Sequence, residues 1–428
     1  MITATGLLRA VAAGLLAGVV CLGAASCGLG GRADSAPEAR HHGFEVLRGK
    51  PAVLWIDWAR CAEPLRDPDQ ALAFALSARD MGITHLGLET RDHSGVPVLG
   101  GEHRYAESAT ALREAAAATG LRLALVHPLF LANAAAEDPA GLVHYAEWEE
   151  EGPAVRLFRP GSDDSPGTRL SPALQDNRAR ELEVLGAVLG TDLDFDVLIL
   201  SEAGFPALES GVEPAARRAF ELWSGLSFRR WPAEVLGDAP PPNPYMAEAR
   251  GELWHAWLAW RATVWKDFLG ALRRTAEEHH GPDGVPPITV LVDAPYPMHL
   301  RQGVNWASPA RPVTEDFGWL PRGYETTGTG HLLDGVILGL WEPGLLTREQ
   351  AEDAGFAWWA SLEGSAALAE RYRRGESAVW SAVPVGPGGW ARTAGAALEE
   401  TEGLLLIGAG DLLENPEYWE ELGSSRPF

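Results

Sequence analysis

Short apolar segments alternate with amphipathic ones along most of the chain, which is 428 residues long. Eight of the apolar segments are five to seven residues long and are hydrophobic almost throughout. Uninterrupted runs of this length are typical of parallel β-strands that are buried on both faces. The expected strands are Ala52–Asp57, His85–Glu89, Leu121–His127, Val197–Glu202, Ile288–Asp293, Gly335–Trp341, Ala378–Val383 and Gly403–Ala409.

Helical patterns lie between most of these strands. Their periodicity predicts helices over Gln70–Met81, Glu107–Thr119, Asn177–Leu189, Gly251–Glu278 and Thr347–Arg374, the last with glycines inside it. Eight strand–helix units over about 380 residues predict an α/β fold, a (β/α)8 TIM barrel with long βα-loop insertions. A doubly wound sheet is the alternative, but no Gly-rich phosphate turn follows the first strand.

Three long insertions follow the third, fourth and fifth expected strands. They span residues 133–175, 203–250 and 294–330, and the first carries AEWEEEGP, which reads as a solvated acidic loop. All three leave the carboxyl ends of strands, so they should crowd the same rim of the barrel. Loops this long in a compact domain are usually functional or disordered, and their aromatic content argues against disorder.

The amino terminus has the pattern of an export signal. An apolar run follows Arg9, and small residues then lead to Cys27 in the sequence AASC. We expect residues 1–27 to be a lipoprotein-type signal peptide with Cys27 as the acylated residue. Residues 28–49 are polar and rich in small side chains, which predicts a flexible tether before a barrel at 50–428. The alternative is an ordinary signal peptide cut near Ser26. Either way the protein is expected to be exported.

Charge and composition indicate which classes of partner the protein can bind. The chain has 59 Asp and Glu residues against 35 Lys and Arg, a formal net charge of −24. This charge disfavours nucleic acid and anionic membrane surfaces, so we expect contact with a membrane only through the lipid anchor. The 17 Trp residues suit stacking on sugars, although most Trp side chains are core. The sequence contains no Walker motif, metal-type His/Cys cluster or Gly-x-Ser-x-Gly elbow and therefore predicts no cofactor and no metal.

Carboxyl groups recur at the ends of the expected strands. Two converging carboxyls, one protonated and one ionised, are the minimum equipment for cleaving a glycosidic bond. Glu202, Asp293 and Glu342 are the candidate catalytic residues. A structural role is the alternative for each, and Glu342 in particular can cap the helical region that follows it.

Other residues near the strand ends are candidates for substrate binding. Some offer flat aromatic faces, and the others offer polar or charged contacts. They are Asp57, Trp58, Glu89, Arg91, His127, Trp306, Trp319 and Trp341. Two structural alternatives stay open: Asp57 can hold backbone N–H groups of the next loop, and Glu89 can pair with Arg91.

Four stretches carry a resemblance to a known family. They are AVLWIDWAR, MGITHLGLETRDHSGVPVL, DFDVLILSEAGFP and WHAWLAWRATVWKDFLGALR. Together they resemble the family-10 glycosylhydrolase-like proteins, which are secreted or lipid-anchored bacterial barrels. The resemblance covers roughly Ala52 to Gly344 and implies a barrel that acts on a polysaccharide or cell-envelope glycan.

The fourth strand departs from that family's pattern. Aligning the following Phe-Pro places Ser201 where the family has Asp and Glu202 where it has Tyr. Two main hypotheses follow. In the first, the protein is a glycoside hydrolase with Glu202 as general acid and Asp293 as nucleophile or base, Glu342 being the rival for that second role. In the second, it is a non-catalytic, lipid-anchored glycan-binding protein of the same fold, and a structural envelope protein is a third alternative.

Overall fold

The computed structural model describes residues 50–424 with internal gaps. The residues outside the described part are 1–49, 93–94, 100–102, 133–138, 151, 158–167, 208, 241–250, 283, 293–301, 312, 316, 319, 342–343, 374–376, 388 and 425–428. Four residues singled out in the sequence fall among them: Cys27, Asp293, Trp319 and Glu342.

Eight parallel strands close into a barrel in the order β1-β12-β11-β10-β9-β8-β3-β2. They are β1 (Ala52–Ile56), β2 (His85–Glu89), β3 (Arg122–Pro128), β8 (Val197–Ser201), β9 (Ile288–Val292), β10 (Gly335–Gly339), β11 (Ala378–Pro384) and β12 (Gly403–Ile407). Each coincides with one of the expected strands. The parallel pairing of β1 with β12 closes the sheet, so the (β/α)8 barrel is confirmed and the open doubly wound sheet is wrong.

Side chains that alternate along the strands fill the inside of the barrel. Trp380 is fully buried there, in a cluster with residues such as Val53, Ile199 and Ile337. Gly403 lies on the strand next to Trp380, and a Cβ atom added to it would come within 2.7 Å of the indole ring. The ring therefore takes the volume that a side chain at position 403 would occupy, which keeps the interior packed as in other barrels of this type.

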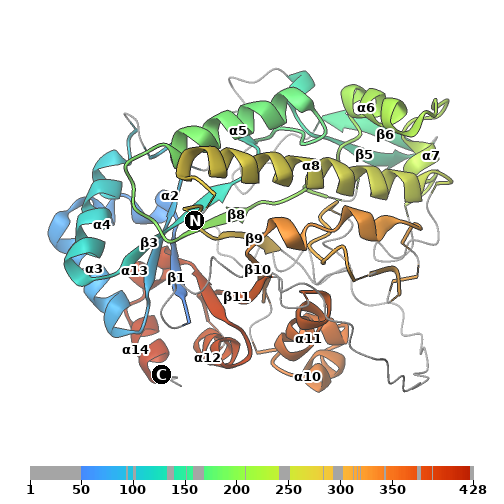
Figure 1. The fold of residues 1–428 in the computed structure, drawn as a ribbon. Coiled ribbons are helices and arrows are strands. Elements are labelled where there is room, and N and C mark those ends of the chain that lie inside the picture. Colours follow the sequence, from blue (N-terminus) through green and yellow to red (C-terminus); the bar gives the residue numbers. More distant parts are fainter. Residues whose placement is uncertain are drawn as a thin grey trace.

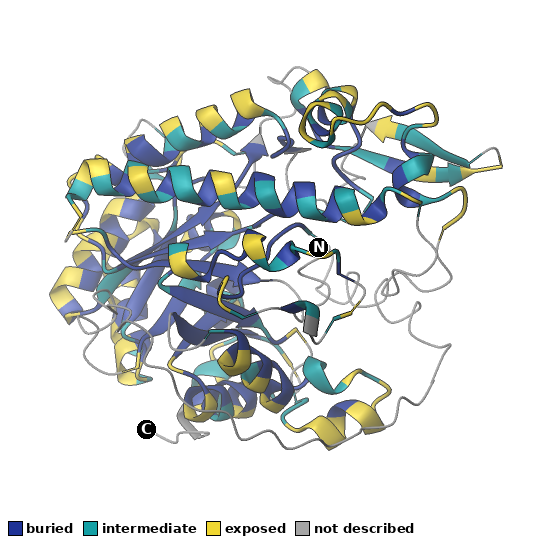
Figure 2. Cartoon of the chain, turned by 45° about the vertical axis from the view of Figure 1, so that its right-hand side comes forward, coloured by how far each residue is buried: buried dark blue, intermediate teal, exposed yellow. Residues whose placement is uncertain are grey.

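Helices surround the barrel, as Figure 1 shows. The main ones are α3 (Pro68–Asp80), α4 (Ala106–Thr119), α5 (Gln175–Leu189), α8 (Trp254–His280), α11 (Leu362–Arg373) and α12 (Trp390–Glu400). Shorter helices are α2 (Trp58–Cys61), α10 (Arg348–Asp353), α13 (Ala409–Glu414) and α14 (Glu417–Ser424). Figure 2 shows dark blue strands inside and exposed positions on the outer sides of the helices. Within the described residues, no helix is both long and apolar enough to cross a bilayer.

One expected helix is divided in the structure. Thr347 caps α10 by accepting a hydrogen bond from the backbone of Gln350, and that helix ends at Asp353. Gly355 then adopts a φ of 80°, a left-handed conformation that stops the helix. A short 3-10 turn at Trp358–Ala360 leads into α11. The helical stretch expected from Thr347 to Arg374 is therefore two helices, and the interruption expected from its glycines falls at Gly355.

The insertions after β3 and β8 form secondary structure of their own. Strands β5 (His144–Glu149) and β6 (Gly152–Leu157) make an antiparallel hairpin, and α6 (Pro214–Ser224) and α7 (Ala233–Leu236) lie beside it at one end of α8 (Figure 1). The prediction of a solvated acidic loop at AEWEEEGP is wrong. Ala146 is buried and Trp148 partly buried, whereas Glu147 and Glu149 are exposed, so the stretch alternates as a half-buried strand does.

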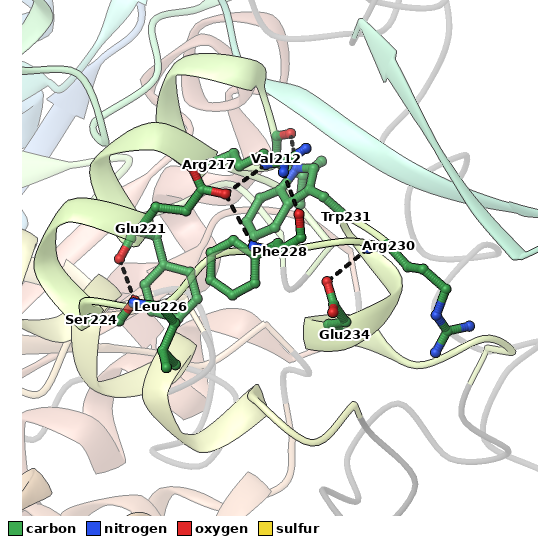
Figure 3. A network of polar contacts seen from close by, with 10 residues as sticks. Val212, Arg217, Glu221, Ser224, Leu226, Phe228, Arg230, Trp231 and Glu234 are labelled. Atoms are coloured by element: carbon green, nitrogen blue, oxygen red, sulfur yellow. Dashed lines mark hydrogen bonds and ion pairs between the residues drawn. The ribbon is translucent and has the colours of Figure 1, made fainter.

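An aromatic cluster joins this insertion to α8. Phe220 of α6 packs on Phe228, and both rings contact Trp231. Trp231 in turn packs edge-on against Trp257 of α8 and donates to the carbonyl of Val212 at 2.8 Å. Figure 3 shows the polar contacts around these rings. Many of the Trp residues counted in the sequence therefore serve as core, with four of them buried along α8 alone.

Polar contacts fix the turn between α6 and α7. Glu221 accepts from the guanidinium of Arg217 at 3.0 Å and from the backbone N–H of Phe228 at 3.2 Å (Figure 3). The backbone N–H of Arg230 donates to Glu234 at 2.9 Å. This insertion is thus a packed unit over the described residues rather than a loose loop.

Candidate active site at the carboxyl end of the barrel

Strand parity decides which residues reach the mouth of the barrel. Side chains two positions apart on a strand share a face. Some residues lie at or just past the carboxyl end of a strand and two positions after a residue that points into the barrel. Their side chains therefore face the mouth. Five of the described ones are polar or aromatic, and we call them the mouth residues: Trp55, Asp57, Glu89, Ser201 and Trp341.

Glu89 ends β2 and is only partly exposed. Its Oε1 atom accepts a hydrogen bond from Nε1 of Trp55 on the neighbouring strand at 2.8 Å, and its backbone carbonyl accepts one from Nε1 of Trp58 at 2.8 Å. Burial, followed by the negative charge of Asp57, raises the pKa of Glu89 to about 8. Glu89 therefore keeps its proton at neutral pH. Among the described residues, no cation forms a salt bridge with it.

Asp57 lies directly after β1. Its Oδ1 atom accepts from the backbone N–H of Ala59 at 2.9 Å and caps the short helix α2. The structural alternative considered from the sequence, that Asp57 holds backbone N–H groups of the next loop, describes this contact. Asp57 nevertheless faces the same side of β1 as Trp55, so its charge is felt by Glu89.

The candidate aromatic residues differ in exposure. Trp341 is 37% exposed, and its ring lies over Gly339, where an added Cβ would come within 2.5 Å of its Nε1 atom. Trp58 and Trp306 are only 1% and 2% exposed. Trp341 is therefore the most exposed of these three candidates for stacking, and Trp58 and Trp306 lie in the core.

His127 and Arg91 lie outside the barrel wall. His127 follows the interior residue Val126, so it faces outward, where its Nε2 lies 2.8 Å from Oε1 of Glu181 on α5. The guanidinium of Arg91 is 3.0 Å from Oε2 of the same carboxylate. Arg91 thus pairs with Glu181 rather than with Glu89. Sequence reasoning missed Glu181, because nothing in a helix pattern marks one buried acid among exposed ones.

Glu202 lies just past the end of β8 and turns away from the barrel axis. Its backbone φ is 58°, and its side chain forms an ion pair with the nearly buried Arg169 of β7 (Thr168–Arg169). β7 pairs with β4 (Leu131–Ala132) in the insertion after β3. The inward position on β8 belongs to Ser201, which is 1% exposed and whose hydroxyl has no hydrogen-bond partner among the described residues.

The remaining candidates are not placed by the structure. Asp293 directly follows β9, and Glu342 follows Trp341, but both lie outside the described residues, as does Trp319. Across the described part of the chain, no group of three or more His, Cys, Asp or Glu side chains is arranged to hold a metal ion.

The chain resembles known proteins in fold rather than in sequence. No family model and no curated protein matches it. Among solved structures, it is similar to the glycoside hydrolase domain of PgaB (BpsB) from Bordetella bronchiseptica, with a TM-score of 0.52 and 14% identity over 88% of this chain and 99% of that one. The alpha-L-fucosidase isoenzyme 2 from Paenibacillus thiaminolyticus gives 0.53 and 11% over 89% of this chain and 49% of that one.

A third similar structure is the beta-galactosidase from Marinomonas ef1, with a TM-score of 0.52, 12% identity and coverage of 83% of this chain and 53% of that one. The chain thus spans about half the length of the fucosidase and of the galactosidase but nearly all of the PgaB domain. All three are glycoside hydrolases, and at this identity the likeness establishes a shared barrel fold. It does not single out family 10.

Proposed function

We propose that the protein is an exported glycoside hydrolase that cleaves a polysaccharide or cell-envelope glycan by carboxylate acid–base catalysis. The observation that carries the proposal is the pair of mouth carboxyls on adjacent strands, Glu89 and Asp57, beside the indole of Trp55. The glycoside hydrolases of similar fold support the substrate class. Barrel enzymes place their chemistry at this end of the strands.

The second candidate function is glycan binding without cleavage. It is favoured by Ser201, whose short hydroxyl stands at the inward position on β8 where the resembling family has a carboxylate. Trp341, with its ring partly exposed at the mouth, would serve either function. Asp293 remains a candidate nucleophile or base in the hydrolase, and Glu342 remains its rival for that role.

A combined screen separates the two functions. The full-length protein is incubated with a panel of soluble polysaccharides and tested for released reducing ends, and it is also tested on a glycan array. Release of sugar supports the hydrolase. Binding on the array without cleavage of any bound glycan supports the glycan-binding protein. If the protein neither cleaves nor binds any glycan, both candidate functions are contradicted.

Export and anchoring form a separate part of the proposal. The AASC sequence supports acylation at Cys27. We expect the wild type in the membrane fraction and Cys27→Ser in the soluble fraction, with mass spectrometry identifying a lipid-modified amino terminus in the wild type. An unmodified amino terminus elsewhere, on protein that is soluble in the medium, would contradict lipidation.

A further inference from the structure

The geometry of the barrel mouth points to Glu89 as the general acid and to Asp57 as the carboxylate that receives the proton from water. This assignment rests on the proposed hydrolase function and deepens it. It differs from the expectation that Glu202 donates the proton.

The first support is direction. Glu89 shares a face of β2 with Gly87, whose missing side chain is replaced by Val53 from inside the barrel: a Cβ on Gly87 would lie 2.9 Å from Cγ1 of Val53. The carboxyl group two residues later therefore points into the mouth. Asp57 stands in the same relation to Trp55 on the adjacent strand.

The second support is the way the carboxyl group is held. Trp55 donates to Oε1 of Glu89 at 2.8 Å, and a hydrogen bond from the backbone of Trp58 also lowers the pKa of this carboxyl group. The Trp58 indole fixes the backbone of Glu89 from the other side. The carboxyl group is thus held in place by donors from Trp55 and Trp58. Positioning of this kind is what general acid catalysis requires.

The third support is the contrast between the two mouth carboxyls. Glu89, although partly exposed like Asp57, has no described salt-bridge partner, and its raised pKa of about 8 agrees with a protonated group at neutral pH. Asp57 is partly exposed, and its Oδ1 is stabilised by the N–H of Ala59. Neighbouring carboxyls in unlike environments divide into an acid and a base.

The reaction balances with these two groups and one water molecule. The bond between the anomeric carbon and the glycosidic oxygen breaks, and that oxygen takes the proton of Glu89. Water adds its oxygen to the anomeric carbon and gives a proton to Asp57. The products are a sugar hemiacetal and an alcohol, and the two carboxyls return to their starting states by exchanging protons with solvent.

Glu202 is less suited to this role. A carboxyl that pairs with a guanidinium is the ionised form, whereas a general acid must carry a proton. Its partner Arg169 is nearly buried and belongs to the insertion. The ion pair instead ties the end of β8 to β7.

The test compares Glu89→Gln with a matched control on polysaccharides and on 4-nitrophenyl glycosides, whose leaving group departs without protonation. Glu89→Gln should lower polysaccharide cleavage by about 10²–10⁴-fold and cleavage of the nitrophenyl glycosides far less. Glu213→Gln is the control, because Glu213 is also a buried carboxyl, hydrogen-bonded to Ser171 in the insertion and not in the mouth. It should retain activity.

A variant of Trp55, which positions Glu89, adds a second measurement. A purely structural role of Trp55 would not change the pH profile of kcat/KM. The indole hydrogen bond from Trp55 lowers the pKa of Glu89. Trp55→Phe removes it, so the alkaline limb of the kcat/KM profile should move to higher pH. Circular dichroism and thermal unfolding of all three variants would confirm that they are folded.

The outcomes are distinct. If the wild type cleaves a polysaccharide and Glu89→Gln cleaves it within about twofold of the same rate, the assignment of Glu89 is overturned and the hydrolase function stands. If the wild type cleaves no member of the panel, the hydrolase function fails, and the assignment fails with it. A loss in Glu89→Gln that is equal on both substrate classes would also overturn the acid role.

Discussion

Glu89 and Glu181 lie on opposite sides of the barrel wall and show two ways in which a protein encloses a carboxyl group. Glu181, on the outer side, contacts His127 at 2.8 Å and Arg91 at 3.0 Å. Glu89, on the inner side, has one indole donor and an acidic neighbour. The first arrangement satisfies the charge, and the second disfavours it.

The pKa values follow from these partners. Burial acts to raise the pKa of Glu181, but the hydrogen bond from His127 and the charge of Arg91 hold it below its ordinary value. Burial lowers the pKa of His127, so its neutral ring donates from Nε2 to Glu181 and accepts at Nδ1 from Thr90. The outer site is a satisfied structural network. The inner site retains an unfavourable arrangement that function can explain.

The largest expected effect breaks the outer network. Glu181→Ala leaves the buried guanidinium of Arg91 without its counter-charge, which should lower the free energy of unfolding by about 3–5 kcal/mol. Urea denaturation followed by circular dichroism measures it. Glu183→Ala, at an exposed position on the same helix, is the control and should change stability by less than about 0.5 kcal/mol. Equal effects of the two changes would show that the network does not stabilise the fold.

The second prediction concerns Glu89, whose ionisation should lower the stability of the folded protein. Folding raises the pKa of Glu89 from its ordinary 4.5 to about 8, so the folded protein binds a proton that the unfolded chain releases. Wild-type stability should therefore fall as pH rises through this window, at about 1.4 kcal/mol per pH unit at most, relative to Glu89→Gln. Wild type and Glu89→Gln should have similar free energies of unfolding near pH 4.5. The variant should be the more stable of the two near pH 8.

For Glu181, the stability of the wild type relative to Glu181→Gln should rise with pH, which is opposite to the trend for Glu89. Its pKa is lowered in the folded state, so its contribution is present above the ordinary value and is lost as pH falls through the folded one. Denaturant titrations of wild type, Glu89→Gln and Glu181→Gln test both signs when they cover the Glu89 window from pH 4.5 to about 8 and also extend below pH 4.5, where Glu181 titrates. If Glu89→Gln and Glu181→Gln diverge from the wild type in the same direction with rising pH, the proposed contrast is incorrect.

The smallest expected effect concerns Trp341. Its ring is partly exposed beside Gly339 at the mouth, and loss of an aromatic contact costs about 0.5–1.5 kcal/mol, so Trp341→Ala should weaken glycan binding by about 2- to 12-fold. Isothermal titration with a glycan selected from the array measures it. Trp223→Ala is the control, because Trp223 is 46% exposed on α6 and away from the mouth. A similar loss in both variants would remove Trp341 from the binding site.

The positions of the strands were accessible from the sequence because parallel strands are buried on both faces. Such strands appear as uninterrupted apolar runs, and all eight occur where these runs predicted them. The β5–β6 hairpin was missed even though its residues alternate. Its acidic side chains raised the polarity of the stretch and concealed the alternation between buried Ala146 and its exposed neighbour Glu147.

Whether a side chain at a strand end points into the barrel or away from it depends on the residue at which the strand ends. The sequence favours Glu202 as the catalytic acid because it is the carboxylate at the end of an apolar run. The strand stops at Ser201, and the left-handed backbone of Glu202 carries its side chain toward Arg169 in the insertion. A shift of one residue exchanges the inner and outer faces of a strand, and the sequence pattern does not fix that register.

By itself, the sequence determined the eight-stranded barrel, the order of its elements and the presence of carboxyls at its rim. Only the tertiary structure decided which carboxyl is paired and which keeps a proton. Trp55 and Glu89 are 34 residues apart, and His127 and Glu181 are 54 apart. The protonation state of an enclosed acid is set by such distant neighbours, because burial penalises a charge that only a correctly placed partner can stabilise.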